Sequence, residues 1–387
     1  MISCLKYKTL YLLTFLVFIS CQEESPLDEI KSEGNEYIKF SAPVISVEND
    51  TKSTPKDALS AGDKFGVLGY CLSYVLGSDT EINYNSGAAD WSGKKSNCAP
   101  LVFYKEPVTV TESGGADYVN LKQWYVDGKD LDGSTNENVK GADNYSYSFF
   151  AYYPFDVYFN IVEPAAQTTK GAPVIQYTMP QTGNSETSQL DHKITPDAMI
   201  GVLYNRKKAD GDLKFSFNHI LTALGFEVNN YSNKDLKVYS VELRGNFFKG
   251  LKIDLRGSVF SYNVTEERYQ GIYTLFSSDE GLLLKAPGEG EVVTSSESPI
   301  GGEHVLLISG VSPYFGENVE VYLDYQLGDG EKKTFHQGRP TTFIPSPGTK
   351  YTAQLNFVGD AFVLQFVVDN NSNWQDGESD NDDIIFE

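Results

Sequence analysis

Apolar and polar residues alternate with a period of two along many short stretches of this chain. In the first of them, Ile38, Phe40 and Ala42 alternate with Lys39 and Ser41. This period places successive side chains on opposite faces of a β-strand. Further strands are predicted at 65–71, 101–110, 118–126, 213–217, 220–228, 236–243, 251–255, 259–264, 305–308, 319–327, 333–335, 350–358 and 362–368, and 198–203 is a short apolar run. Helical periodicity is not convincing over any ten-residue stretch, so the pattern predicts an all-β fold of antiparallel sandwiches.

The stretch 145–159 is unusually rich in aromatic residues, and Pro154 ends its strand. Alternation places Tyr147 and Phe149 on one face and Phe150 and Tyr152 on the other. We interpret these side chains as core residues. The other interpretation is a platform on which carbohydrate stacks.

Polar stretches rich in Gly, Ser, Pro and Asn separate the strands. The longest, at 77–97, 160–195 and 277–302, predict loops or irregular structure, with one strand inside the last. The charged, Gly-containing stretch 205–212 predicts a domain boundary, which divides the chain into a domain at 37–208 and a domain at 209–387. Either part is long enough to bury its own core.

The N-terminus has the layout of a secretory signal. Lys6 and Lys8 precede the apolar run 9–19, which is too short to cross about 30 Å of hydrocarbon as a helix. The sequence Phe18-Ile-Ser-Cys21 resembles a bacterial lipobox, which implies a signal peptide at 1–20 and acylation of Cys21. The following Gln22-Glu-Glu-Ser25 resembles the acidic export tag of surface lipoproteins of Bacteroidetes. We therefore expect residues 21–36 to be an acidic tether on an outer-membrane lipoprotein exposed at the cell surface.

Charge and cysteine content agree with a location outside the cytoplasm. The formal net charge is −22, and loss of Lys6 and Lys8 with the signal makes the exported chain more acidic still. We do not expect such an acidic chain to bind nucleic acid, and its acidity keeps an extracellular surface soluble. Cys71 and Cys98 remain after processing, and an oxidising compartment allows them to form a disulfide.

Motifs for catalysis or metal binding are lacking in the sequence. The histidines, His192, His219, His304 and His336, are scattered without metal-ligand spacing. A nucleophile elbow and a phosphate loop are likewise missing. The tail 369–380 begins like a calcium loop, but Trp374 and Asp380 occupy positions that need Gly and Glu. We expect a non-enzymatic protein without a cofactor or metal.

Several short motifs, in this order, resemble the fimbrillin family of Bacteroidetes, the subunits of protease-assembled surface pili. They are Ile38-Lys-Phe40, Thr51-Lys52, Phe65-Gly-Val-Leu-Gly-Tyr70, Phe150-Ala-Tyr-Tyr-Pro154, Asp197-Ala-Met199, Leu213-Lys-Phe-Ser-Phe-Asn-His219 and Trp374. The resemblance implies two transthyretin-like antiparallel β-sandwich domains in tandem.

The resemblance also implies a structural or anchoring subunit of a fimbria that contributes to adhesion. In that family a trypsin-like protease removes the first strand, and a strand of a neighbouring subunit replaces it. The partners would be other fimbrial subunits, the outer membrane through lipid, and a host or bacterial surface receptor.

Cleavage in the family usually follows Arg, whereas the first Arg of the exported chain is Arg206. Lys52, in the loop after the first strand, is the candidate cleavage site. An uncleaved chain would serve as a basal anchor or cap, and a tip adhesin is another role. The alternative function is a surface-exposed glycan-binding lipoprotein that does not polymerise.

Overall fold

The computed structural model describes residues 36–45, 58–72, 91, 98–180, 188–257, 260–310, 314–338 and 343–368. The chain divides into the units Met1–Glu36 and Tyr37–Glu387, and all of the described strands belong to the second. Apart from the helical residue Trp91, its described secondary structure is strands and short 3-10 helices, the latter being η2 (Ala142–Asn144), η3 (His192–Ile194) and η4 (Lys208–Asp210). The all-β expectation is confirmed, while the tandem transthyretin-like arrangement stays a prediction. Among the described residues, no helix has the length and apolarity needed to cross a membrane.

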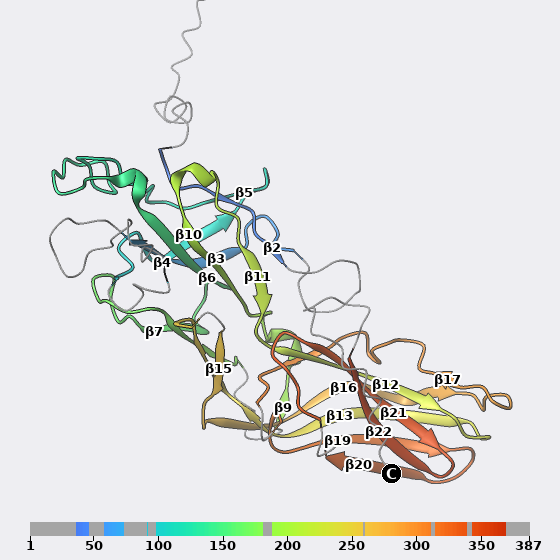
Figure 1. Cartoon of the computed structure of the whole chain (residues 1–387). Coiled ribbons are helices and arrows are strands. Elements are labelled where there is room, and N and C mark those ends of the chain that lie inside the picture. The colour runs from blue at the N-terminus through green and yellow to red at the C-terminus, as the bar shows by residue number, and fades with distance from the viewer. Residues whose placement is uncertain are drawn as a thin grey trace, which may run out of the picture. The chain divides into compact units, whose positions relative to one another are not determined.

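An eight-stranded sheet contains the first strands of the chain (Figure 1). Its order is β1-β5-β4-β3-β6-β10-β11-β2. The members are β1 (Phe40–Ser41), β2 (Val44–Ile45), β3 (Lys64–Leu72), β4 (Phe103–Val110), β5 (Gly115–Asp117), β6 (Ser146–Tyr153), β10 (Met199–Arg206) and β11 (Ser216–His219). Neighbours are antiparallel except β2 and β11, which are parallel.

Strand β6 is buried on both faces, as its aromatic alternation predicts. Tyr147 and Phe149 belong to one apolar core, and Phe150 and Tyr152 belong to another. A strand with apolar side chains on both faces must lie between two packed layers. The aromatic stretch is therefore core, and the interpretation as a carbohydrate platform is wrong for these side chains.

The remaining strands form three smaller sheets. One is β17 (Val293–Thr294), β12 (Thr222–Asn230), β21 (Lys350–Val358) and β22 (Ala361–Val368) in that order, with β18 (Val305–Leu307) also paired to β12. The second is β20 (Lys332–Gly338), β19 (Gly316–Leu327), β13 (Leu236–Phe248), β16 (Arg268–Leu284) and β9 (Gln189–Leu190). The third is β15 (Ser261–Val264), β14 (Gly250–Asp254), β8 (Val174–Thr178) and β7 (Phe159–Glu163).

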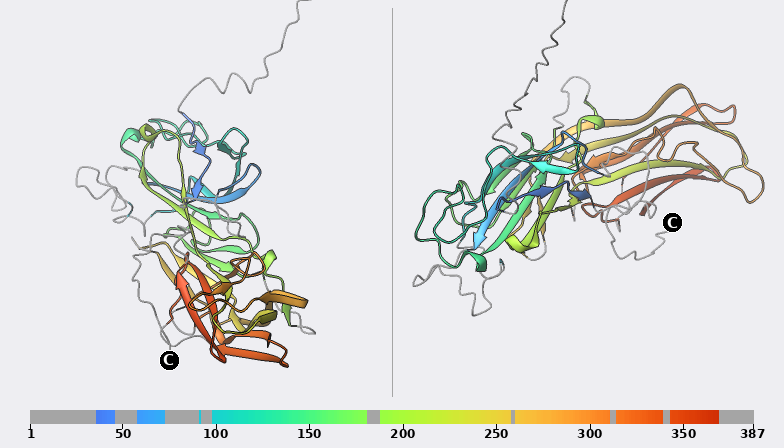
Figure 2. Two further views of the ribbon diagram at one scale, coloured as in Figure 1. Left: turned by 90° about the vertical axis from the view of Figure 1, so that its right-hand side faces the viewer. Right: turned by 90° about the horizontal axis from the view of Figure 1, so that it is seen from above.

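The first two of these smaller sheets pack face to face. The ring of Tyr325, from β19, lies 5.7 Å from that of Phe357 and 5.0 Å from that of Phe362, in β21 and β22. Figure 2 shows the yellow-green β12 beside the red β21 and β22. Inward-facing apolar residues of both sheets belong to one core, which is the packing of a β-sandwich.

Strand pairs cross the predicted boundary at residue 208. Strand β11 joins the eight-stranded sheet through β10, and β14 pairs with β8 from Gly250↔Thr178 to Asp254↔Val174. These pairs join the two halves by backbone hydrogen bonds. The division into domains at 37–208 and 209–387 stays a prediction.

Three local predictions from the sequence are wrong. Residues 118–126 form a loop, with only an isolated bridge from Gln123 to Tyr37, because the Tyr118 hydroxyl bonds to the backbone of Lys122 and turns the chain. The stretch 160–195, expected to be irregular, contains most of β7 and all of β8 and β9. No strand was predicted over 268–276, where β16, the longest of the described strands, begins; beyond 277 it enters the stretch expected to be a loop with one strand.

Candidate functional site

The N-terminal strand, which we define as residues 37–45, lies between two segments of the eight-stranded sheet. On one side, β1 pairs antiparallel with β5. On that side the Ile38 N–H donates to the Lys122 carbonyl (2.9 Å), and the Ala42 N–H donates to the Gly114 carbonyl (3.0 Å). Backbone hydrogen bonds therefore run along one edge of this strand.

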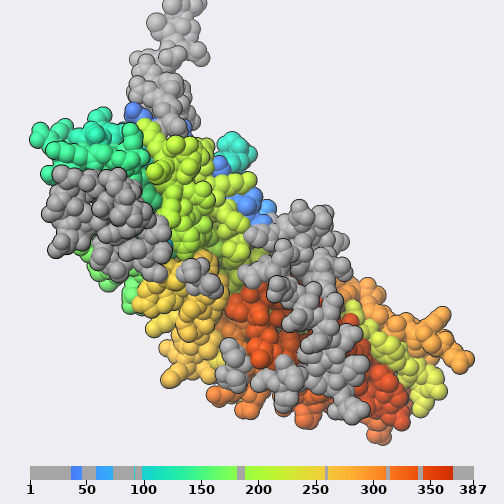
Figure 3. All heavy atoms as spheres, viewed as in Figure 1, coloured from blue at the N-terminus to red at the C-terminus, as the bar shows by residue number. Residues whose placement is uncertain are grey.

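The opposite edge is paired as well. The N–H groups of Ser41 and Val44 donate to the carbonyls of Leu213 (2.9 Å) and Phe215 (3.0 Å), and the Leu213 N–H donates to Lys39 (2.8 Å). The N-terminal strand thus closes the sheet between β5 and β11. In Figure 3 its blue atoms reach the surface beside the yellow-green atoms of the β10–β11 region.

Phe40 is the central side chain of the N-terminal strand and is only 3% exposed. Its ring lies 5.8 to 6.4 Å, centroid to centroid, from the rings of Phe65, Phe103, Tyr118, Phe149 and Phe215. Ile38 and Ile45 are buried in the same core, whereas Lys39 is exposed. One face of the strand therefore completes a core. Burial of each large apolar side chain contributes roughly 1.5–3 kcal/mol to the free energy of unfolding.

Tyr118 attaches the loop before β6 to this strand. Its hydroxyl donates to the Ile38 carbonyl (2.7 Å) and accepts from the Lys122 N–H (3.2 Å). Burial raises the pKa of Tyr118 to about 12, so the hydroxyl keeps its proton near neutral pH.

Cys71 and Cys98 are both half-buried, and Cys71 lies on β3. The pKa of the Cys71 thiol lies well above its ordinary value, mainly because the thiol is buried. A hydrogen bond with Tyr147 lowers this pKa in part, and the charge of Cys98 raises it further. Such an interaction requires Cys98 to be near. Their disulfide stays a prediction.

Several predicted sites lie outside the described residues. These are the signal 1–20, Cys21, the tether up to residue 35, Lys52, and the tail 369–387 with Trp374 and the calcium-like pattern. Acylation at Cys21 and cleavage at Lys52 accordingly stay predictions.

The histidines lie apart from one another in separate contacts. His219 is fully buried, and its Nδ1 lies 2.8 Å from Oδ1 of Asp197. His192 contacts Glu303 (2.7 Å), and His336 lies 3.6 Å from Glu320. Within the described ranges, no three His, Cys, Asp or Glu side chains gather as metal ligands would.

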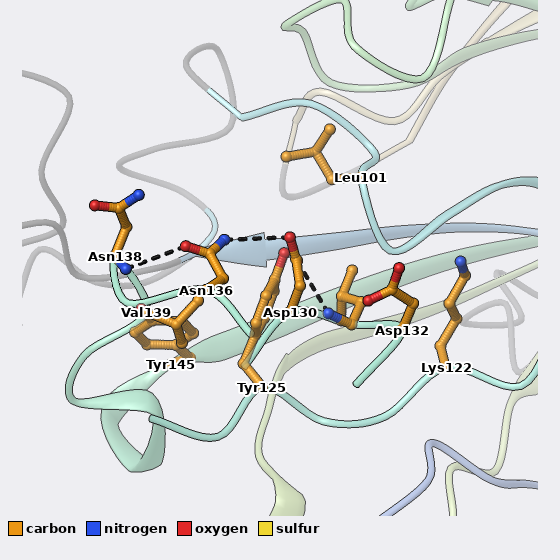
Figure 4. Close-up of a pocket in the computed structure, with 10 residues that line it drawn as sticks. Leu101, Lys122, Tyr125, Asp130, Asp132, Asn136, Asn138, Val139 and Tyr145 are labelled. Carbon is orange, nitrogen blue, oxygen red and sulfur yellow. Dashed lines mark hydrogen bonds between the residues drawn. The ribbon is translucent and has the colours of Figure 1, made fainter. Parts of the chain in front are cut away.

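A surface depression of about 490 Å³, which the sequence did not reveal, lies at the loop between β5 and β6 (Figure 4). The residues that line it are Leu101, Lys122, Tyr125, Asp130, Leu131, Asp132, Asn136, Asn138, Val139 and Tyr145. The available signal was the density of Asp, Asn and Gly in 127–138, which is also typical of any surface loop.

Comparison with known proteins shows what this chain resembles in fold. No family model and no curated protein matches this sequence. A fimbrial protein of Bacteroides vulgatus is similar in structure, with a TM-score of 0.52 and 16% identity over 86% of this chain and 98% of that one. The chain has the fold of that fimbrial protein.

Two further structures are more distant. A candidate cell adhesion protein of Bacteroides uniformis has a TM-score of 0.44 and 13% identity, over 89% of this chain and 99% of that one. One of Bacteroides ovatus has a TM-score of 0.41 and 16% identity, over 86% and 96%. Both resemble this chain less in structure than the Bacteroides vulgatus protein does.

Proposed function

We propose that this protein is a structural or anchoring subunit of a cell-surface fimbria, assembled by strand exchange, that contributes to adhesion. The observation that carries the proposal is the N-terminal strand, which is paired on both edges and plugs a core with Phe40. The fimbrial-type fold supports the same role.

Loss of the N-terminal strand would expose a groove suited to another strand. The carbonyls of Lys122, Gly114, Leu213 and Phe215 would lose their partners, and the rings around Phe40 would be uncovered. Unpaired backbone groups beside an apolar groove favour the addition of a strand from another chain. A replacement needs apolar residues at alternate positions, as in the N-terminal strand.

The C-terminal strand β22 is our candidate donor. It lies at the end of its sheet, paired with β21. Phe362, Leu364 and Phe366 recur at alternate positions, which is the spacing of Ile38, Phe40 and Ala42. Insertion in the groove would require β22 to leave its own sheet.

Export as a lipoprotein belongs to the same proposal. Acylation of Cys21 would hold the subunit at the outer membrane, exposed at the surface, until cleavage at Lys52. Without cleavage the lipid stays, and the subunit acts as an anchor. The proposed role involves no catalysis and no cofactor.

Limited trypsin digestion tests the proposal. We expect the first cut after Lys52, giving the new N-terminus Ser53-Thr-Pro-Lys, followed by rising light scattering with retained β-sheet circular dichroism. Electron microscopy should then show filaments. A first cut at Arg206, or a cleaved protein that stays monomeric, would contradict assembly by strand exchange.

Two controls separate strand exchange from aggregation. The variant Lys52→Gln should resist the cut and remain monomeric under the same digestion. A synthetic peptide of residues 36–47 should block self-association of the cleaved protein by refilling the groove. The same peptide with Phe40→Ala should block it much less, because the plugging ring is gone.

A further inference from the structure

We infer that the depression at the loop connecting β5 to β6 binds a neutral saccharide. This inference goes beyond the proposed function, because strand exchange neither needs nor explains such a site. The depression, of about 490 Å³, lies within the range of roughly 300–1,000 Å³ found for small-ligand sites.

Part of the lining of the depression is apolar and aromatic. Leu131, Val139 and Tyr145 are buried, and the Tyr125 ring is T-shaped to that of Tyr145 at 5.6 Å. Figure 4 shows Tyr125 standing between Asp130 and Asn136. These buried side chains support the accessible apolar surface, which Leu101 (47% exposed) and the half-buried Tyr125 provide. The C–H face of a pyranose packs on such a surface.

The rest of the lining carries carboxylates and amides held in place by hydrogen bonds. The Asn136 amide donates to Asp130 (3.2 Å) and accepts from the Asn138 N–H (3.1 Å), while Asp132 accepts from the Ser134 N–H (2.9 Å). A carboxylate offers about four lone-pair sites, so these bonds leave capacity for a ligand. Fixed side chains lose little conformational entropy when a ligand binds.

The chemistry of these groups selects the ligand. Asp130 and Asp132 accept hydrogen bonds, and the Asn amides both donate and accept, which suits vicinal hydroxyls. Burial chiefly raises the pKa of Tyr125, and the charges of Cys71 and Asp130 and a hydrogen bond with Asp130 add to it. Tyr125 therefore keeps its proton, donates it to Asp130 and offers its oxygen as an acceptor. Among the lining residues that the structure describes, Lys122 is the one cation, against two carboxylates, so sialylated, sulfated and phosphorylated ligands are disfavoured.

An array of neutral glycans and their sialylated and sulfated counterparts tests the inference with the full, uncleaved chain. EDTA in the buffer prevents binding through a bound cation. We expect neutral glycans alone to bind, with an affinity then measured by calorimetry. Retention of acidic glycans only, or of no glycan, would overturn the inference.

Variants assign the binding to this depression. Asn138→Ala and Asp132→Asn alter exposed side chains, and each should weaken binding about tenfold or more while leaving the thermal midpoint unchanged. Asn160→Ala, at an exposed position on β7 outside the depression, is the matched control and should bind as the unaltered chain does. Equal affinity in all three variants would overturn the assignment. Because uncleaved protein is used, a failure of self-association leaves this result unaffected.

Discussion

Phe40 contacts the rings of five other aromatic residues, although its strand β1 has only two residues, because β1 lies over the centre of a core. We expect Phe40→Ala to lower the free energy of unfolding by about 3–5 kcal/mol, since a large buried ring is lost and a cavity remains. Urea unfolding followed by circular dichroism measures this change.

Lys39 provides the matched control, being the adjacent exposed residue on the same strand. Lys39→Ala should change the free energy of unfolding by less than about 0.5 kcal/mol. Equal effects of the two substitutions would show that Phe40 does not plug this core in solution.

His304 is almost fully buried, and burial, followed by the nearby charge of Lys350, lowers its pKa from 6.5 to about 3. The unfolded chain therefore takes up a proton at this residue as pH falls below 6.5, while the folded chain does not. The neutral imidazole therefore contributes to the free energy of unfolding above pH 6.5. This contribution is lost as the pH falls toward 3, by up to about 1.4 kcal/mol for each pH unit.

The variant His304→Gln isolates this effect from that of the many carboxylates. Between pH 6 and 4 the unaltered protein should lose more free energy of unfolding than the variant, as measured by urea titration at each pH. Parallel pH profiles would mean that His304 titrates normally in the folded chain.

At the scale of the element, the close approach of β13 and β19 at Gly316 requires a residue without a Cβ. Gly316 has φ +151°, and a Cβ added there would lie 1.8 Å from the Asn246 carbonyl oxygen. Gly316→Ala should destabilise the protein by about 3–5 kcal/mol, because the two backbones must separate. Thermal unfolding with calorimetric detection tests this.

Gly290 serves as the comparison for Gly316. It has φ +78° with nothing within 4 Å of an added Cβ, so Gly290→Ala carries only the cost of the left-handed conformation, about 1 kcal/mol. A loss at Gly316 no larger than at Gly290 would contradict the close approach of β13 and β19.

At the scale of the whole molecule, charge should govern assembly. The full sequence carries a formal net charge of −22, and most of its acidic residues lie after Lys52, so cleaved copies repel one another at low ionic strength. After tryptic cleavage, self-association should accelerate as NaCl is raised from about 10 to 150 mM, where the Debye length falls from about 30 to 8 Å. Light scattering against time provides the rate.

Uncleaved protein at the same salt concentrations is the control and should not scatter, because its groove remains filled. A rate that falls with added salt would point to association through opposite charges, and would argue against repulsion between acidic subunits.

The sequence by itself determined the all-β class and much of the strand content. The alternation in 145–153 also determined that β6 has two buried faces, because the direction of a side chain follows from strand geometry alone. On the same kind of local information, the sequence placed Phe40 on the apolar face of its strand.

Only the tertiary structure decided which strands meet. The segments on either side of the N-terminal strand, β5 and β11, are distant in sequence, and partner choice depends on packing summed over the whole core. The same holds for the pair β8–β14 across the predicted boundary and for the depression, where Leu101 meets residues 122–145. Local patterns set the face of each residue, whereas non-local contacts set its neighbours.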